Sequence, residues 1–115
     1  MPQDVDWVYA HGTGSLQNDR AEAAAVLHLE LGQTPTTSTK AVHGHTLAAS
    51  GALEIIITDY VLNEQNLIPS WKSNSQHYNI QIQQDCEKKP VHNVLKNTLG
   101  FGGINSSLII TKGGL

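Results

Sequence analysis

Two histidines of this chain stand among small, turn-forming residues. His11 lies in Ala-His-Gly-Thr-Gly-Ser at residues 10–15, and His45 ends Ser-Thr-Lys-Ala-Val-His-Gly-His at residues 38–45. A side chain mounted on a turn after a strand projects from the end of an element instead of packing in the core, and catalytic groups are often placed there. The two segments therefore predict candidate catalytic positions. For His11 alone, a turn histidine bonded to a neighbouring carbonyl is the competing interpretation.

Metal and nucleotide binding are weaker interpretations of the same segments. His43 and His45 flank a glycine, and imidazole is the commonest metal ligand, but a site closed by protein side chains needs three or four suitably placed ligands. The other histidines and the single cysteine are scattered: His28, His77, His92 and Cys86. The stretches 12–14 and 100–103 lack both the six-position glycine fingerprint and a Gly-Lys-Ser/Thr ending. We therefore expect no protein-only metal site and no phosphate loop.

A cysteine nucleophile is also disfavoured within this chain. Cys86 stands in residues 83–90, which carry no turn signature and no adjacent histidine. We therefore interpret it as a bystander thiol. A single cysteine forms no internal disulfide, which agrees with a reducing compartment.

Composition excludes several classes of partner. The formal net charge is −3 with a pI near 6.0, and the seven Lys and Arg residues form no long run, so we expect no nucleic-acid binding. No apolar run approaches the roughly 18–20 residues of a membrane span, and residues 1–6 are acidic instead of basic. These features predict a cytoplasmic protein. At 115 residues, 39% of them hydrophobic, the chain forms one domain, residues 1–115.

Hydrophobic patterning predicts two strands and two helices in the first half of the chain. Alternating β-forming residues predict a strand at 5–9, and β-branched threonines suit a short strand at 36–39. A capping-box spacing and an apolar face predict a helix over 19–31, closed by Gly32. An apolar stripe on most sides predicts a buried helix over 48–64.

The second half of the chain has the pattern of a loop followed by strands. Residues 63–79 are polar and predict a surface loop. Apolar alternation predicts strands at 78–82, 91–95 and 108–111, the last two joined around the glycine turn at 100–103. The resulting β-α-β-α-β-β-β order predicts an α/β fold with a mixed five-stranded sheet covered by helices.

Three segments match the motifs of one family in order and approximate spacing. The first is Tyr-Ala-His-Gly-Thr-Gly-Ser at residues 9–15, with Asp19 and Glu22 behind it; the second is the segment at 38–45; the third is Asn-Thr-Leu-Gly-Phe-Gly-Gly-Ile-Asn at 97–105. Together they resemble the C-terminal half of β-ketoacyl synthases of the thiolase-like superfamily, the condensing enzymes of fatty-acid and polyketide assembly. Departures from the family pattern predict a specialised member: His43, Leu99 and Ile104.

The resemblance implies roles for eight residues. His11 and His45 are the expected active-site histidines, which assist decarboxylation of a malonyl unit and donate hydrogen bonds to the developing enolate oxygen. Lys40 is the expected lysine beside this pair. The other implied roles are Phe101 as gate of the acyl pocket and oxyanion-hole donor, Glu54 as the carboxylate partner of Lys40, Asn105 as a supporting residue, and Thr13 and Ser15 as contacts of the phosphopantetheine arm.

The resemblance also implies an activity and partners. The implied reaction is a decarboxylative Claisen condensation of an acyl thioester with malonyl-acyl carrier protein, without a cofactor other than the phosphopantetheine that carries the substrate. The family nucleophile is a cysteine in a separate N-terminal half, and no segment here matches it. We therefore expect a C-terminal fragment or split subunit that is inactive alone. The expected partners are acyl carrier protein, the N-terminal ketosynthase half or a complementary subunit, and a second copy in a dimer.

Two other functions stay open. A non-catalytic partner of the chain-length-determining type keeps the fold without the chemistry, although the presence of both histidines and Lys40 speaks against it. A small stand-alone binding module predicts a self-contained core. The apolar helix over 48–64 predicts instead an exposed apolar face that needs a partner.

Overall fold

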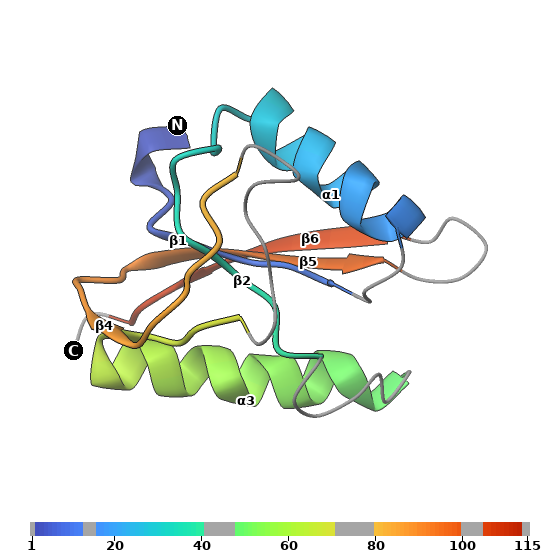
Figure 1. Cartoon of the computed structure of the whole chain (residues 1–115). Helices are drawn as coiled ribbons and strands as arrows, with labels where there is room; N and C mark the ends of the chain where they lie inside the picture. Colours follow the sequence, from blue (N-terminus) through green and yellow to red (C-terminus); the bar gives the residue numbers. More distant parts are fainter. Residues whose placement is uncertain (1, 13–15, 41–47, 71–79, 100–104, 114–115) are drawn as a thin grey trace.

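The computed structural model describes residues 2–12, 16–40, 48–70, 80–99 and 105–113. Over this part of the chain, a mixed sheet lies between two long helices, one on each face (Figure 1). The helix α1 (Leu16–His28) covers one face and α3 (Ala48–Glu64) covers the other, while a short helix η1 (Pro2–Asp4) precedes the sheet. The expected fold class, a mixed sheet covered by helices, is confirmed.

The sheet combines parallel and antiparallel pairs. Its order is β2 (Thr36–Thr37), β1 (Trp7–Tyr9), β5 (Asn93–Leu99) and β6 (Asn105–Thr111). The central strand β1 runs parallel to β2 and to β5, and β5 pairs antiparallel with β6. Among the described residues the sheet has four strands where five were expected. Ile82, from the expected strand at 78–82, adds one parallel bridge to Thr36, and residues 78 and 79 lie outside the described part.

Alternation along the strands divides the apolar core into two layers. Side chains of a strand point to opposite faces in turn, so Trp7 and Tyr9 face α3 whereas Val8 faces α1. In β5, Val94 belongs to the layer under α3 and Leu95 to the layer under α1. The layer under α3 also contains Val61, Leu62, Leu67 and Val91, and the layer under α1 contains Ala23, Val26, Leu31 and Ile80.

The helix α1 is shifted along the chain relative to the predicted range 19–31. It begins earlier, and Asp19 stands in its first turn, where a carboxylate interacts favourably with the helix dipole. The prediction that Gly32 ends the helix is wrong. Glu30 takes the left-handed conformation (φ 62°) instead, and Leu31 N–H bonds the Val26 carbonyl at 2.9 Å in a Schellman-type closure.

The helix α3 has the predicted bounds, and the chain after it is more ordered than expected. Gln65, with φ 55°, ends the helix by bonding the Val61 carbonyl at 2.8 Å. The expected loop at 63–79 then contributes β3 (Asn66–Leu67), which pairs antiparallel with β4 (Glu87–Lys88). Two-residue strands have no periodicity, so neither was predictable from the pattern.

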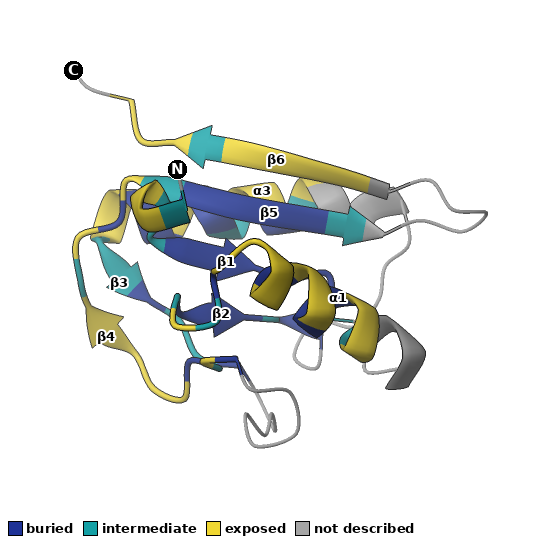
Figure 2. Cartoon of the chain, turned by 90° about the horizontal axis from the view of Figure 1, so that it is seen from above, coloured by how far each residue is buried: buried dark blue, intermediate teal, exposed yellow. Residues whose placement is uncertain are grey.

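Apolar side chains remain exposed on the outer side of α3 and on β6. Figure 2 shows buried β1 and β5 beside a largely exposed β6. The exposed apolar residues include Ile55, Ile56 and Tyr60 on α3 and Leu108 and Ile109 on β6. The prediction that helix 48–64 is buried is therefore wrong for its outer side, whereas the expected exposed apolar face is confirmed. No helix within the described ranges is both long enough and apolar enough to cross a membrane.

Candidate functional site

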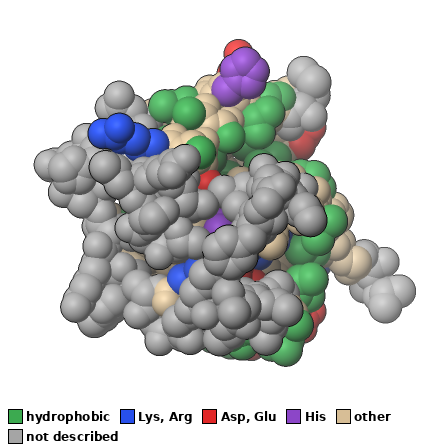
Figure 3. Space-filling model, turned by 90° about the vertical axis from the view of Figure 1, so that its right-hand side faces the viewer, with side chains coloured by type: hydrophobic (Ala, Val, Ile, Leu, Met, Phe, Trp, Pro, Cys, Tyr) green, Lys and Arg blue, Asp and Glu red, His purple; other side chains and the backbone are tan. Residues whose placement is uncertain are grey.

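The carboxyl ends of β1, β2 and β5 lie at one edge of the sheet, because the three strands are parallel. At this edge β1 continues into His11 and Gly12, and β2 continues into residues 38–40. Figure 3 faces this end of the molecule, where basic, acidic and histidine side chains are visible. Ligands of open α/β sheets commonly bind outside the carboxyl ends of the strands, so this edge is the candidate site.

Glu22 of α1 holds the turn that carries His11. One carboxylate oxygen of Glu22 accepts the His11 N–H at 2.6 Å, and the other accepts the Gly12 N–H at 2.7 Å. Both His11 and Glu22 are buried. Burial raises the pKa of the Glu22 carboxyl, although the two backbone hydrogen bonds act in the opposite direction. One carboxylate thus fixes two successive peptide groups, so α1 sets the position of the turn.

The turn passes so close to the segment after β2 that only glycine fits at residue 12. Gly12 has φ 53°, a left-handed conformation that other residues rarely adopt. A Cβ atom there would lie 1.9 Å from Ser38 Oγ. Ser38 Oγ donates to the Gly12 carbonyl at 3.1 Å, and Ser38 N–H donates to Ser70 Oγ at 2.8 Å. The two segments that carry the predicted histidine and lysine are therefore joined directly.

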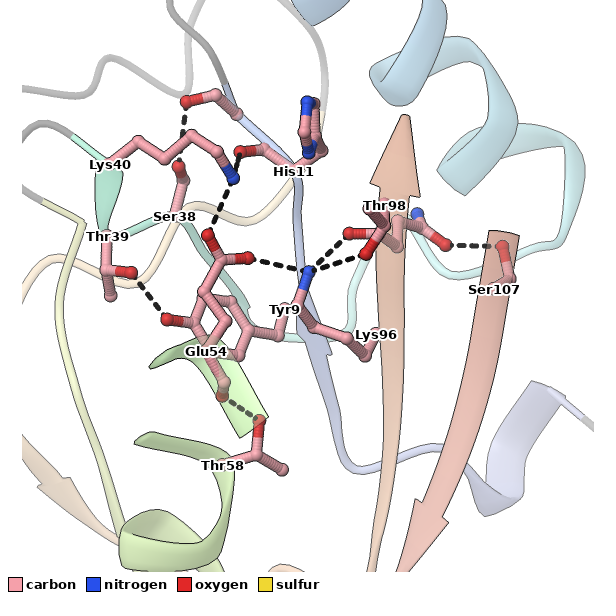
Figure 4. Close-up of polar contacts among 12 residues, drawn as sticks. Tyr9, His11, Ser38, Thr39, Lys40, Glu54, Thr58, Lys96, Thr98 and Ser107 are labelled. Atoms are coloured by element: carbon pink, nitrogen blue, oxygen red, sulfur yellow. Dashed lines mark hydrogen bonds and ion pairs between the residues drawn. The ribbon is translucent and has the colours of Figure 1, made fainter. Parts of the chain in front are cut away.

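Lys40 links the His11 turn to α3. Its Nζ donates to the His11 carbonyl at 2.6 Å and lies 2.7 Å from Glu54 Oε2. Lys40 and Glu54 are both buried. The predicted partnership of these two residues is therefore present in the structure, and Lys40 contacts the backbone of His11 (Figure 4).

A second buried lysine, Lys96 on β5, meets the other oxygen of the same carboxylate. Lys96 Nζ lies 2.7 Å from Glu54 Oε1, donates to the Asn97 carbonyl, and stands 5.1 Å from the centre of the Tyr9 ring. Burial lowers the pKa of Lys96. Burial alone would raise the pKa of Glu54, but the hydrogen bonds from Lys40 and Lys96 outweigh it and hold that pKa below its ordinary value.

The sequence reasoning did not assign Lys96. One signal was available: Lys96 follows Val94 at strand spacing, on the face of β5 that points into the apolar layer at α3. A lysine on the buried face of a strand needs a counter-charge. The identity of that counter-charge, Glu54, depended on the packing of α3 over the sheet.

Two aromatic residues of β1 tie the strand to the segment that leads to Lys40. Trp7 Nε1 donates to Thr37 Oγ1 at 2.9 Å, and Thr37 Oγ1 donates to the Ile68 carbonyl at 2.7 Å. The Tyr9 hydroxyl shares a 2.5 Å hydrogen bond with Thr39 Oγ1. Burial raises the pKa of Tyr9, so the phenol stays neutral. These buried contacts place the chain just before Lys40.

The other predicted site residues are not placed by the structure. Asn105 begins β6, and its side chain is not described. Four more predicted residues lie outside the described residues: Thr13, Ser15, His45 and Phe101. Cys86 is exposed and forms no disulfide. Within the described ranges, no group of His, Cys, Asp and Glu side chains could hold a metal ion.

The described cluster holds a turn histidine between buried groups of both charges. Two ammonium groups share the Glu54 carboxylate, one of them also holds the His11 carbonyl, and Glu22 holds the His11 N–H. The His11 imidazole has ring nitrogens that can donate or accept a hydrogen bond. A donor that is held in place before the reaction can stabilise negative charge that develops on a reacting group. The arrangement therefore suits a site in which the His11 ring acts on such a group.

Comparison with known proteins finds similarity to one part of a family of longer proteins. The sequence model described as beta-ketoacyl synthase, C-terminal domain, matches residues 1–74. A putative polyketide beta-ketoacyl synthase 1 of Streptomyces cyaneus is 34% identical over 96% of this chain and 28% of its own length. A polyketide biosynthesis malonyl-ACP decarboxylase of Bacillus subtilis is 30% identical over 96% of this chain and 27% of its own length.

Solved structures agree with this assignment. A type II polyketide ketosynthase, bound to the hexaketide and in complex with its acyl-carrier protein, matches with a TM-score of 0.89 and 26% identity, over 99% of this chain and 29% of its own. The thiolase-like fold expected from the motifs is therefore confirmed. The chain spans less than a third of the length of each of these proteins.

Proposed function

This chain belongs to the β-ketoacyl synthase family and corresponds to the family's C-terminal domain. From this premise we propose that it supplies the histidine and lysine residues of a ketosynthase active site. The proposed reaction condenses an acyl thioester with malonyl-acyl carrier protein and releases carbon dioxide. One observation carries the proposal: Lys40, Glu54 and the His11 backbone meet in a buried cluster at the carboxyl ends of the parallel strands.

The proposed chemistry has two stages. First, the carbon–carbon bond to the malonyl carboxylate breaks, carbon dioxide leaves, and the electron pair forms an enolate. The enolate carbon then attacks the carbonyl carbon of the acyl group held on a cysteine, and the cysteine thiolate leaves. His11 and His45 donate hydrogen bonds to the enolate oxygen, and one such preorganised donor contributes about 3–4 kcal/mol to barrier lowering.

Lys40 acts through the backbone in this proposal. Its Nζ holds the His11 carbonyl at 2.6 Å, while Glu22 holds the His11 N–H at 2.6 Å. The peptide groups on both sides of the His11 Cα are thereby fixed, which limits the directions that the imidazole can take. A misplacement of about 1 Å can cost 10²-fold in rate, so this restraint matters for the chemistry.

The remaining predicted residues keep the roles that their motifs imply. Phe101 gates the acyl pocket and its N–H completes the oxyanion hole, Asn105 supports the site, and Thr13 and Ser15 contact the phosphopantetheine arm. The substrate arrives on the phosphopantetheine of acyl carrier protein, and no further cofactor takes part. The nucleophilic cysteine comes from the N-terminal ketosynthase half or from a complementary subunit.

The exposed apolar surface supports a larger assembly. Ile55, Ile56 and Tyr60 stand exposed on α3, and Leu108 and Ile109 on β6. Large exposed apolar patches usually mark a protein contact. We propose that the N-terminal half and a second copy in a dimer cover parts of this surface, and that the assembly works in the cytoplasm.

The test combines this chain with a cysteine-bearing N-terminal ketosynthase part. Release of carbon dioxide from malonyl-acyl carrier protein and formation of condensed product are both measured, because one relative is named a decarboxylase. We expect neither activity from the chain alone and both from the mixture. His11→Ala or His45→Ala should each lower decarboxylation by about 10²- to 10³-fold.

The control variant is Lys112→Met, which removes a cation from an exposed position. It should leave both rates unchanged. Activity that survives both histidine substitutions would contradict the proposal and favour a non-catalytic partner of the chain-length-determining type. Carbon dioxide release without condensed product would restrict the function to decarboxylation.

A further inference from the structure

Lys96 is a charged residue at a buried position of its strand. The face of β5 that points to α3 carries Val94, which is fully buried in the apolar layer there. Lys96 is the next residue on that face, pairs in register with Tyr9, and is only 2% exposed. Lysine is almost never fully buried unless it is paired. Its burial therefore has to be offset by specific contacts.

One of those contacts is an ion pair with a carboxylate, and Lys96 Nζ also donates to the Asn97 carbonyl and to Thr98 Oγ1 at 3.5 Å. Lys96 Nζ lies 2.7 Å from Glu54 Oε1, and Lys40 Nζ lies 2.7 Å from Glu54 Oε2 (Figure 4). The two lysines come from different elements, one from β5 and one from the segment after β2. Glu54 is thus held from two directions at once, with each oxygen facing its own ammonium group.

Stability alone is a poor explanation for this arrangement. Replacing a buried ion pair or triad by apolar residues of similar volume is often neutral or stabilising. An apolar residue at position 96 would extend the layer that Val94 already forms. Residues that break the local pattern of an element tend to occur at functional sites. The ammonium of Lys96 is better explained by its effect on Glu54.

A continuous line of contacts joins Lys96 to the turn histidine. Lys96 holds Glu54, Glu54 holds Lys40, and Lys40 Nζ donates to the His11 carbonyl. We propose that Lys96 is a positioning residue of the site: it fixes one oxygen of Glu54 so that the other is presented to Lys40, and thereby sets the His11 peptide. The proposal rests on the proposed function for the identity of the reaction.

The charged groups around Lys96 determine how its removal changes the pKa of Glu54. Glu54 faces it from α3, Glu22 from α1 and Lys40 from the segment after β2, and the neutral ring of Tyr9 lies beside it on β1. Without Lys96, Glu54 keeps its burial but loses one of the two cations that oppose the effect of burial on its pKa. The pKa of Glu54 then rises, and the carboxyl takes up a proton at a higher pH.

The test variant is Lys96→Met, which keeps an unbranched side chain one heavy atom shorter and removes the charge. It is assayed for decarboxylation of malonyl-acyl carrier protein in the mixture with the cysteine-bearing part. We expect kcat to fall by about 10- to 100-fold, as for a misplaced catalytic group, with KM almost unchanged. The acid limb of the pH profile should move to higher pH. Lys96→Gln, which restores a hydrogen-bond donor, serves as the second variant and should recover part of kcat.

Two controls separate positioning from simple loss of packing. Val94→Ala opens a cavity on the same face of β5 without touching Glu54, so it should lower stability but leave the acid limb in place. Glu54→Gln removes the carboxylate, and adding Lys96→Met to it should change kcat little further. A full additional loss in the double variant would show that Lys96 acts independently of Glu54 and would overturn the proposal.

A readout without turnover keeps this inference separate from the proposed function. In the full chain, carbon-13 NMR of the Glu54 carboxyl should show a higher pKa in Lys96→Met than in the unchanged chain. Absence of turnover in the unchanged mixture would refute the proposed function and leave this measurement valid. The positioning role would be refuted if the Glu54 pKa were the same in Lys96→Met and in the unchanged chain. It would also be refuted if the mixture were active and Lys96→Met changed neither kcat nor the pH profile.

Discussion

Gly12→Ala is the sharpest stability prediction, because two separate costs can be worked from the structure. The left-handed backbone at φ 53° costs a residue with a Cβ about 1–2 kcal/mol. The new Cβ would also lie 1.9 Å from Ser38 Oγ and 2.4 Å from Ser38 Cβ. Ser38 has to move, and overpacking of this kind costs about 1–3 kcal/mol. Together we expect a loss of about 2–5 kcal/mol.

A double variant separates the two costs. Ser38→Gly removes both clashing atoms, so Gly12→Ala in that background should cost only the backbone part, about 1–2 kcal/mol. The free energies of unfolding are measured by urea denaturation followed by circular dichroism for all four combinations. Ser38→Gly alone also removes the hydrogen bond to the Gly12 carbonyl, and the double-mutant cycle corrects for the free energy of that bond. An equal cost of Gly12→Ala in both backgrounds would refute the assigned contact.

Two further predictions concern buried polar groups. The pKa of Glu54 in the folded chain lies below its ordinary value of 4.5. The ionised carboxylate therefore stabilises the fold above pH 4.5, and this contribution is lost as the pH falls through the folded pKa. Urea denaturation at decreasing pH should show the loss, and Glu54→Gln should reduce the dependence of the unfolding free energy on pH. Thr37→Val leaves the buried Trp7 indole and the Ile68 carbonyl without the Thr37 hydroxyl. This loss should lower the free energy of unfolding by about 1–3 kcal/mol, measured by thermal unfolding. The control Thr111→Val removes an exposed hydroxyl and should cost little, and equal losses in the two variants would contradict the assigned contacts.

The elements that the sequence predicted well are those with long or distinctive patterns. The apolar helix over 48–64 has the expected bounds, and the expected antiparallel order of the last two strands is present in the β5–β6 pair. The end of α1 was placed too late, because the chain closes that helix with Glu30 in a left-handed conformation instead of with glycine. A hydrogen-bonded closure and the apolar contact of Leu31 stabilise that choice, and neither is visible from composition.

Only the part of the candidate site that lies in the family motifs was predictable from the sequence. The resemblance to the family motifs implied that Lys40 and Glu54 are partners, and the Lys40 ammonium and the Glu54 carboxylate lie 2.7 Å apart. The motifs did not indicate that Lys40 contacts the His11 backbone, nor that Lys96 shares the carboxylate. Both contacts depend on the register between strands and on the packing of α3, which no local pattern encodes.

The buried ammonium on β5 also constrains how the sheet can assemble. Because side chains alternate between the two faces, a shift of β5 by one residue against β1 would bring Leu95 under Glu54. The same shift would drive Lys96 into the apolar layer under α1, away from its counter-charge. A misaligned pairing therefore places a desolvated charge under α1 and leaves Glu54 with Lys40 as its remaining ammonium partner, so the ion pair between Lys96 and Glu54 favours the observed strand register.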